Sequence, residues 1–386
     1  MRSESGLVAA VVSGGLLVAA VVVGSPASAA GTAACAGWQV VASPSPGQSS
    51  GLTSVAATSG RSAWAVGSRR NGNGSYRTLI ERWDGTSWKV VPSADPAAGA
   101  SPTDTLDGVV ATAPSNAWAV GFYEKTTTSF RTLIEHWNGV RWAAVPSPNS
   151  GNGENTLAAA AARTTADIWA VGYRQGAFAR RTPIEHWNGK KWSIVPSPNV
   201  GRGDNFLFGV AAVSATQAWA VGSDSRSFGQ TLAMRWNGSR WSVVPTPNPG
   251  QGDRFLLAVA APTARSALAV GSDLNGATTR TLAQRWAGSA WSLTPSPSPG
   301  RDYNSLQAVA ATSAGNAWAA GTRGATPRAA FRTLAEHWNG TTWTVAATPS
   351  PGRGDDSLSG IAAIPRGNGF WAVGAASGRT LIESHC

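Results

Sequence analysis

The sequence predicts an all-β fold that is built from repeats. A motif recurs about every fifty residues, short apolar segments alternate with turn sequences, and no stretch after the first thirty residues has a long 3.6-residue apolar period. The tetrapeptide WAVG, or a close variant, begins at Trp64, Trp118, Trp169, Trp219, Leu268, Trp318 and Trp371. These positions divide the chain into seven repeats.

Each repeat is expected to form four short strands. In the first repeat these are residues 52–59 (LTSVAATS), 63–68 (AWAVGS), 77–83 (RTLIERW) and 87–93 (SWKVVPS). Asp84-Gly85 separates the third and fourth strands, and most repeats have Asn-Gly there, which predicts a hairpin with a two-residue type I′ turn. The proline-rich segment that follows is expected to be an extended connector, because proline cannot donate to a sheet.

Four-stranded repeats of this length and number predict a seven-bladed β-propeller with four-stranded antiparallel blades. A solenoid is the alternative, but its end repeats would need polar caps. The last repeat instead stops after its third strand, at Cys386, and residues 38–44 (WQVVASP) match the missing fourth strand. We therefore expect the N-terminal strand to complete the last blade and close the ring. Cys35 and Cys386 align with the two turn residues of the hairpin, so we expect a disulfide between them.

The first thirty residues are expected to be a secretory signal peptide. An apolar run follows Arg2 and leads to the small-residue cleavage pattern Ala27-Ser28-Ala29. The run is too short and too interrupted for a membrane span. A lipid anchor on Cys35 is the alternative. The predicted organisation is a signal peptide over residues 1–30 and a single propeller domain over residues 31–386, secreted into an oxidising extracellular environment.

The charge composition limits the kinds of partner that this protein is expected to bind. Only 13% of the residues are charged, yet the net charge is +11, which favours an anionic partner; the alternative is that the charge serves solubility alone. We expect no nucleic-acid partner and a monomeric protein.

Repeated tryptophan, histidine and glutamate residues are expected to be structural. All nineteen tryptophans lie in repeat register, as packing between blades requires. His136, His186 and His337 share a slot that holds arginine in other repeats, which predicts a solvated position. The repeated glutamate of the third strand, Glu81 in the first repeat, is expected to make a structural hydrogen bond, for example to an indole N–H. No histidine pair has metal spacing, so no metal and no cofactor are predicted.

Candidate binding residues lie in the least repeated segments, which are the loops between the second and third strands and the connectors. Both are expected to open on one face of the propeller, where recognition usually takes place. An aromatic beside a basic side chain can stack on a sugar ring and hold an anionic group. The loop candidates are Tyr76, Arg77, Phe130, Arg131, Tyr173, Phe178, Arg180, Tyr303, Phe331 and Arg332. The connector candidates, which line the channel mouth or close local Asx-turns, are Asp204, Asp253, Asp302 and Asp355.

The repeat AWAVG…RTLIEHWNG resembles that of secreted bacterial kelch-like propellers of the galactose oxidase-like superfamily. The resemblance covers nearly all of the chain after the signal peptide and implies a propeller fold. A copper radical oxidase would need tyrosine, histidine and cysteine ligands at one site, and the four tyrosines do not share a face with the strand-three histidines. We therefore expect a non-catalytic protein that binds extracellular or cell-envelope glycans, anionic ones by preference. The alternatives are a protein-interaction scaffold and a polysaccharide lyase or glycoside hydrolase that uses Tyr173 or Tyr303.

Overall fold

The computed structural model describes residues 37–97, 102–126, 128–225, 229–324, 330–367 and 369–386. These residues form 29 strands and no helix, which confirms the all-β prediction. The described part of the chain accordingly offers no helix that could cross a membrane. The predicted signal peptide and Cys35 lie outside the described residues.

Most repeats contribute three longer strands and a short fourth strand. In chain order the strands are β1 (Gln39–Val40), β2 (Ser49–Ser59), β3 (Ser62–Arg70), β4 (Tyr76–Trp83), β5 (Trp88–Val90), β6 (Asp104–Ala113), β7 (Asn116–Thr126), β8 (Ser129–Trp137), β9 (Trp142–Ala144), β10 (Asn155–Thr164), β11 (Asp167–Gln175), β12 (Arg180–Arg181), β13 (Ile184–Trp187), β14 (Trp192–Val195), β15 (Asn205–Ser214), β16 (Gln217–Ser225), β17 (Gly229–Trp236), β18 (Trp241–Val244), β19 (Asp253–Thr263), β20 (Ser266–Asn275), β21 (Thr278–Trp286), β22 (Trp291–Leu293), β23 (Tyr303–Ser313), β24 (Asn316–Gly324), β25 (Arg332–Trp338), β26 (Trp343–Ala346), β27 (Asp356–Ala363), β28 (Phe370–Ala376) and β29 (Arg379–His385).

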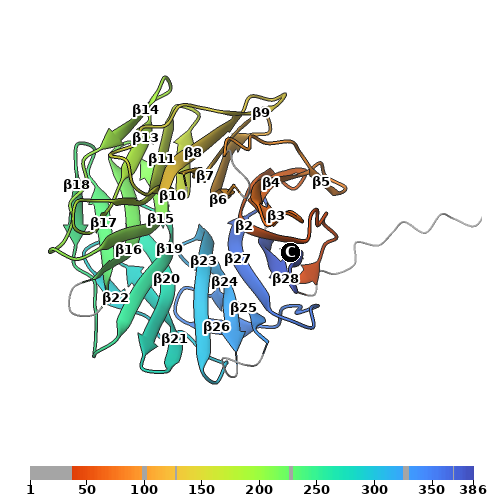
Figure 1. Ribbon diagram of the computed structural model, residues 1–386. Coiled ribbons are helices and arrows are strands. Elements are labelled where there is room, and N and C mark those ends of the chain that lie inside the picture. The colour runs from red at the N-terminus through yellow and green to blue at the C-terminus, as the bar shows by residue number, and fades with distance from the viewer. Residues whose placement is uncertain (1–36, 98–101, 127, 226–228, 325–329, 368) are drawn as a thin grey trace, which may run out of the picture. The chain divides into compact units, whose positions relative to one another are not determined.

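Strands of one repeat pair in antiparallel order to give a four-stranded sheet, which we call a unit; its first strand is the inner strand. Units β2–β5, β6–β9 and β15–β18 are separate sheets, and β10–β14 carries the short β12 beside β11. Units β19–β22 and β23–β26 are joined by one parallel pair, Thr279 with Tyr303. The inner strands contact one another in chain order, β27 contacts β2 again, and the units surround a common centre (Figure 1).

The two ends of the described chain share the last unit. Strand β1 pairs antiparallel with β29, with Gln39 opposite Ser384 and Val40 opposite Glu383, so the sheet order is β1-β29-β28-β27. This confirms that the N-terminal segment supplies the strand that the last repeat lacks. The described chain has no free cysteine, and the pairing of Cys386 with Cys35 stays a prediction because Cys35 is not described.

A β-bulge in each inner strand explains the glycine of the WAVG motif. The register between β6 and β7 shifts between Leu106 and Gly108. A Cβ atom on Gly121 would lie 2.1 Å from the Thr105 carbonyl oxygen, closer than any side chain tolerates. The equivalent glycines show the same approach of 1.9–2.1 Å at Gly67, Gly172, Gly222, Gly271, Gly321 and Gly374. The backbone therefore comes too close at this point for any other residue.

The hairpins between the third and fourth strands differ from the predicted type I′ turn, so that prediction is wrong. Trp83 pairs with Trp88, which leaves a four-residue loop, and only its glycine, Gly85, has a positive φ, of 99°. The Asp84 side chain accepts hydrogen bonds from the backbone N–H groups of Thr86 (2.9 Å) and Ser87 (3.0 Å). Asparagine or aspartate is thus needed for this side-chain acceptor rather than for a left-handed backbone.

Tryptophans of neighbouring units pack together, as predicted. Trp64 of β3 is fully buried, and its ring centroid lies 4.9 Å from that of Trp137 and 5.1 Å from that of Trp142 in the next unit. Trp371 of the last unit packs in the same way against Trp83 and Trp88 of the first, at 5.1 and 5.3 Å. One arrangement of three indoles therefore joins successive units and also joins the last to the first.

The slot shared by histidine and arginine is half-buried against an indole ring, so it is solvated only in part. His136 stacks on Trp118 with ring centroids 4.1 Å apart, and His186 stacks on Trp169 at 4.2 Å. Arg82 occupies the same place over Trp64, with its guanidinium carbon 5.2 Å from the ring centroid. Both residue types fit because each presents a flat group to an indole face. Partial burial lowers the pKa of His136.

Several connectors are held against the third strand of their own unit and against the glutamate of the next, and Asn149 belongs to one of them. Asn149 accepts a hydrogen bond from the backbone N–H of Thr132 (3.0 Å), and the hydroxyls of Thr132 and Ser147 lie 2.6 Å apart. Ser147 in turn donates to Glu185 of the following unit (3.0 Å). The expected indole partner of this glutamate is therefore wrong. Burial raises the pKa of Glu185 to about 8, so the carboxyl is largely protonated at neutral pH.

Candidate functional site

The structure brings the variable loops and the connectors together at one end of the units, which we call the loop face. Three of the predicted aspartates bind the preceding loop, because their carboxylates accept hydrogen bonds from backbone N–H groups. Asp204 accepts from Arg180 (2.7 Å), Asp253 from Gly229 (2.6 Å) and Asp355 from Phe331 (2.9 Å). Asp302 uses its carbonyl oxygen instead, which accepts from the N–H of Thr279 (2.9 Å).

Local closure of several connectors is performed by an asparagine or aspartate one or two residues further along the chain, so the Asx-turns predicted at these aspartates are wrong. Asn205 accepts a hydrogen bond from the N–H of Val200 (2.8 Å), and Asn155 accepts one from Ser150 (3.0 Å). Asn304 and Asp356 do the same for Gly300 and Gly352. The sequence carried a signal for this role, since an asparagine or aspartate opens most of the inner strands.

The arginines of the predicted aromatic–basic pairs mostly bind the connectors. Arg77 makes an ion pair of 2.6 Å with Asp104, whose side chain is fully buried. Arg131 donates to the carbonyl oxygen of Gly151 (3.0 Å), and Arg332 donates to that of Gly354 (3.1 Å). These guanidinium groups position loops, and a ligand would have to compete with the connectors for them.

Arg180 has a different environment, because it lies over two aromatic rings. Its guanidinium carbon is 5.8 Å from the ring centroid of Tyr173 and 5.7 Å from that of Phe206. Two carboxylates hold it there, Glu154 at 2.9 Å and Asp204 at 3.8 Å. We call these five residues the Arg180 platform. Burial raises the pKa of the Tyr173 hydroxyl, and the negative charge of Glu154 adds to the effect, so this tyrosine is protonated at neutral pH.

The aromatic candidates differ widely in exposure. Phe178, between β11 and β12, has 98% of its side chain exposed, and Tyr76 has 41%. Tyr303 and Phe331 instead pack on each other with ring centroids 5.0 Å apart, and Phe130 packs edge-on against Phe122 at 5.3 Å. Phe178 is thus the one aromatic of the predicted set that lies almost wholly in solvent.

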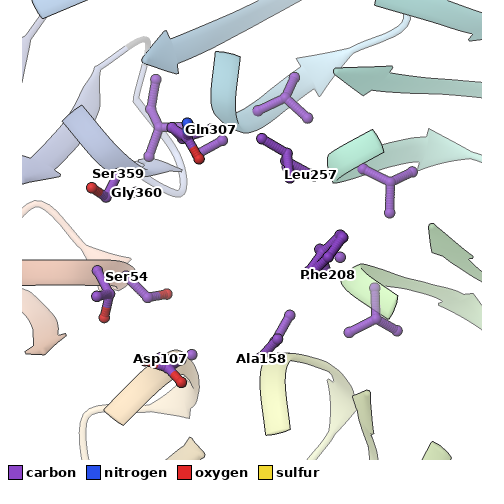
Figure 2. A pocket seen from close by; sticks show the side chains of 18 of the residues that line it. Ser54, Asp107, Ala158, Phe208, Leu257, Gln307, Ser359 and Gly360 are labelled. Atoms are coloured by element: carbon purple, nitrogen blue, oxygen red, sulfur yellow. The ribbon is translucent and has the colours of Figure 1, made fainter. Parts of the chain in front are cut away.

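A cavity lies at the centre of the units, where the sequence analysis expected a channel, but none of the predicted candidate residues lines it. It has a volume of about 160 Å³ and is lined by the inner strands (Figure 2). Phe206 of the Arg180 platform stacks on Phe208 with ring centroids 5.8 Å apart, and Phe208 lines the cavity. Asp107 lines it as well, and desolvation raises the pKa of this carboxyl to about 7. Stacked rings therefore connect the loop face with the cavity, which a carboxyl group from another unit also lines.

Within the described residues, no cluster of histidine, cysteine, aspartate and glutamate has the geometry of a metal site. Asp107 is the single acidic residue among those that line the central cavity. The remaining candidates are spread over the loop face, with Tyr76, Tyr173 and Tyr303 in different units.

Comparison with solved structures identifies the architecture. The chain aligns with YCF48 bound to D1 peptide at a TM-score of 0.55 and 13% identity, over 90% of this chain and 95% of that one. It also aligns with the β-propeller domain of Cps50 (Swd1) from Myceliophteria thermophila at a TM-score of 0.53 and 9% identity, over 89% and 98% of the two chains. The fold is a β-propeller. At these identities the likeness concerns the fold alone, and no protein-family model and no curated protein sequence matches the chain.

Proposed function

We propose that this protein is a secreted, non-catalytic binding scaffold that docks a protein segment on its loop face, over the unit β10–β14 and the unit β15–β18. The observation that carries the proposal is Phe178, whose side chain is 98% exposed at the tip of a loop. A large apolar side chain presented on a rigid scaffold can act as the anchor of an interface. Fold alone does not imply this function, so the argument rests on the loop.

The surroundings of Phe178 support this proposal. The loop that carries it ends at Arg180, which is fixed by two aromatic rings and two carboxylates, so the loop has a rigid base. The net charge of +11 favours a segment with acidic side chains. A propeller of similar length, YCF48, has been solved with a bound peptide, which makes this mode of use compatible with the architecture.

Glycan binding is the second candidate, and the exposure of Tyr76 favours it. Tyr76 is 41% exposed, and its neighbour Arg77 is partly exposed while it pairs with Asp104. An exposed ring beside a guanidinium can stack on a sugar and meet an anionic substituent. The hold of the connectors on Arg77, Arg131 and Arg332 weighs against strongly anionic glycans as ligands.

The number of blades, the disulfide and the export of the protein are part of the same proposal. We infer seven blades, since the inner strands β2, β6, β10, β15, β19, β23 and β27 follow one another around the centre. The pairing of β1 with β29 supports a disulfide between Cys35 and Cys386 at that junction. Export through the N-terminal segment, an extracellular location and kelch-like, galactose oxidase-like membership rest on the sequence motifs.

The experiment is a selection from a peptide-display library on the native protein, with a glycan array in parallel. Peptides selected on the native protein are then measured against Phe178→Ser and against Val140→Ser, a matched control. Val140 is 82% exposed, but it lies in the β8–β9 hairpin at the other end of its unit. We expect Phe178→Ser to weaken binding by about 30-fold, as loss of an interface hot spot does, and Val140→Ser to leave it unchanged.

Two outcomes contradict the docking proposal. If the selected peptides bind Phe178→Ser as tightly as the native protein, the loop is not the anchor. If the glycan array shows binding that Tyr76→Ala abolishes and no peptide is selected, the second candidate takes its place. Turnover of a polysaccharide on the array would show that the protein is an enzyme.

A further inference from the structure

The central cavity is surrounded by one side chain from each inner strand, at the bulge. In the order of the inner strands these side chains are Thr53, Asp107, Ala158, Phe208, Leu257, Gln307 and Ser359. Figure 2 labels all of them except Thr53. The polar members come from four consecutive units and the apolar members from the other three. The cavity therefore has a polar half and an apolar half.

Packing of the propeller does not require this difference. Two positions further along the inner strands, every residue is aliphatic: Val55, Val109, Ala160, Val210, Val259, Val309 and Ile361. A scaffold that needed only to fill its centre could repeat a small or aliphatic residue at the cavity position too, as Ala158 and Leu257 do. The carboxyl group of Asp107 and the ring of Phe208 therefore call for another explanation.

Asp107 is available for a ligand. Its carboxylate makes no hydrogen bond and no ion pair with any other residue of the described chain, whereas the Thr53 hydroxyl donates to the carbonyl oxygen of Leu106 (2.7 Å). Gln307 donates to Ser305 through its amide nitrogen (2.9 Å), which leaves its amide oxygen as an acceptor. The polar half thus offers acceptors around a partly buried carboxylate.

Electrostatics support a positively charged ligand. Desolvation raises the pKa of Asp107 to about 7, because no nearby cation stabilises the carboxylate. The ionisable group that senses the Asp107 charge is the Tyr173 hydroxyl, which is itself protonated at neutral pH. A bound cation would provide the missing partner, and an ammonium group can donate to several acceptors at once.

We propose that the central cavity binds a small organic ammonium compound, with its charged nitrogen at Asp107 and its carbon skeleton against Phe208 and Leu257. The volume of about 160 Å³ sets the size, since a protein cavity of about 150 Å³ accommodates benzene. This site is distinct from the Phe178 loop of the proposed function, and it would exist whether or not a protein segment docks there.

The test is calorimetric titration of the full-length secreted protein with benzylammonium chloride and with benzyl alcohol, a neutral compound of similar shape. The titration is run at about pH 8, where Asp107 is ionised in the free protein and an alkylammonium group remains protonated. We expect saturable 1:1 binding of benzylammonium. Asp107→Asn should weaken it about 10- to 100-fold, as loss of a charge-assisted hydrogen bond does. Benzyl alcohol should bind native protein and variant alike, and weakly.

Two further variants serve as controls for this test. Asp84→Asn removes a carboxylate from an outer hairpin, where other repeats have asparagine, and should leave binding unchanged. Ala158→Phe places a ring at the position that Phe208 holds in the next unit, so it should fill the cavity and abolish binding while Asp107 stays intact. The proposal is overturned if benzylammonium does not bind, if Asp107→Asn binds it equally well, or if Ala158→Phe does. Displacement by sodium or calcium at low concentration would instead make this an inorganic cation site.

Discussion

Replacement of Glu135 by glutamine should change how the stability of this protein depends on pH. Glu135 is fully buried between units, where it accepts a hydrogen bond from the backbone N–H of Ala94 (3.0 Å). Desolvation by burial raises its pKa to about 8, and the negative charges of Asp95 and Asp104 add to the shift. A glutamate in the unfolded chain has a pKa of about 4.3. Burial also raises the pKa of Glu81, Glu185, Glu336 and Glu383.

The direction and size of the effect follow from proton linkage. Between about pH 4.3 and pH 8 the folded protein holds a proton on Glu135 that the unfolded chain has lost, so the free energy of unfolding falls as pH rises. One such group contributes a slope of up to about 1.4 kcal/mol per pH unit. Glutamine keeps the shape and hydrogen-bonding capacity but does not titrate. Between about pH 5.5 and pH 7.5 the free energy of unfolding should therefore fall less for Glu135→Gln than for the native protein. The difference should be up to about 3 kcal/mol.

Urea unfolding followed by tryptophan fluorescence measures this difference, since the chain has nineteen tryptophans in its packing layers. The free energy of unfolding of native protein and variant is compared at about pH 5.5, 6.5 and 7.5, with refolding curves to establish reversibility. The denaturant slope must be the same for both proteins, so that a change in midpoint reports a change in stability.

The chain itself provides the reverse test. Gln284 occupies the glutamate position in its unit and donates a hydrogen bond to the carbonyl oxygen of Pro247 (3.0 Å). Gln284→Glu adds a titrating group to the same environment, so its stability should fall more steeply with pH than that of the native protein. Equal pH slopes for the native protein, Glu135→Gln and Gln284→Glu would refute the reasoning.

Three other predictions concern the scaffold. Gly121→Ala should destabilise the protein by more than about 2 kcal/mol, because the added Cβ meets a carbonyl oxygen, while Gly60→Ala, which meets nothing within 4 Å, should be nearly neutral in the same urea assay. Asn149→Ala should cost about 1–3 kcal/mol in that assay, since it leaves a strand N–H without its acceptor. If Cys35 and Cys386 are bonded, the intact mass of the secreted protein should rise by two hydrogens on reduction. Cys386→Ser should then lower the free energy of unfolding by up to about 5 kcal/mol. Two titratable thiols in the native protein would exclude the bond.

The architecture could be predicted because it depends on repetition. The WAVG glycine, the paired tryptophans and the connector sequence recur in register, and each recurrence reflects one physical requirement that every unit has to meet. The incomplete last repeat predicted the pairing of β1 with β29, since an unpaired strand edge needs a partner. Recurrence identifies the positions that are structurally constrained, and these positions were sufficient to predict the order of the strands.

Repetition does not say which interaction imposes the constraint, and here the sequence interpretation failed. Asn-Gly was assigned to a type I′ turn, but the same pair also suits a longer loop in which Asn138 accepts from two N–H groups. Glu185 was assigned to an indole, but its partner is a serine hydroxyl of the preceding connector. Side-chain partners across units lie about 40 residues apart in sequence, and only the packed ring brings them within hydrogen-bond distance.

The candidate sites are departures from the repeat, and this explains why sequence reasoning found only part of them. Phe178 and Arg180 were found because loop variation is visible in the sequence. Asp107 was missed because it lies inside a strand that otherwise obeys the pattern, and its isolation at the centre depends on six other strands. A residue that breaks register in a loop can be tolerated without function, since loops accept change at little cost. A carboxyl group that breaks register in a narrow cavity has a desolvation cost in every molecule, so the cavity is the position where a departure from the repeat most strongly indicates a ligand.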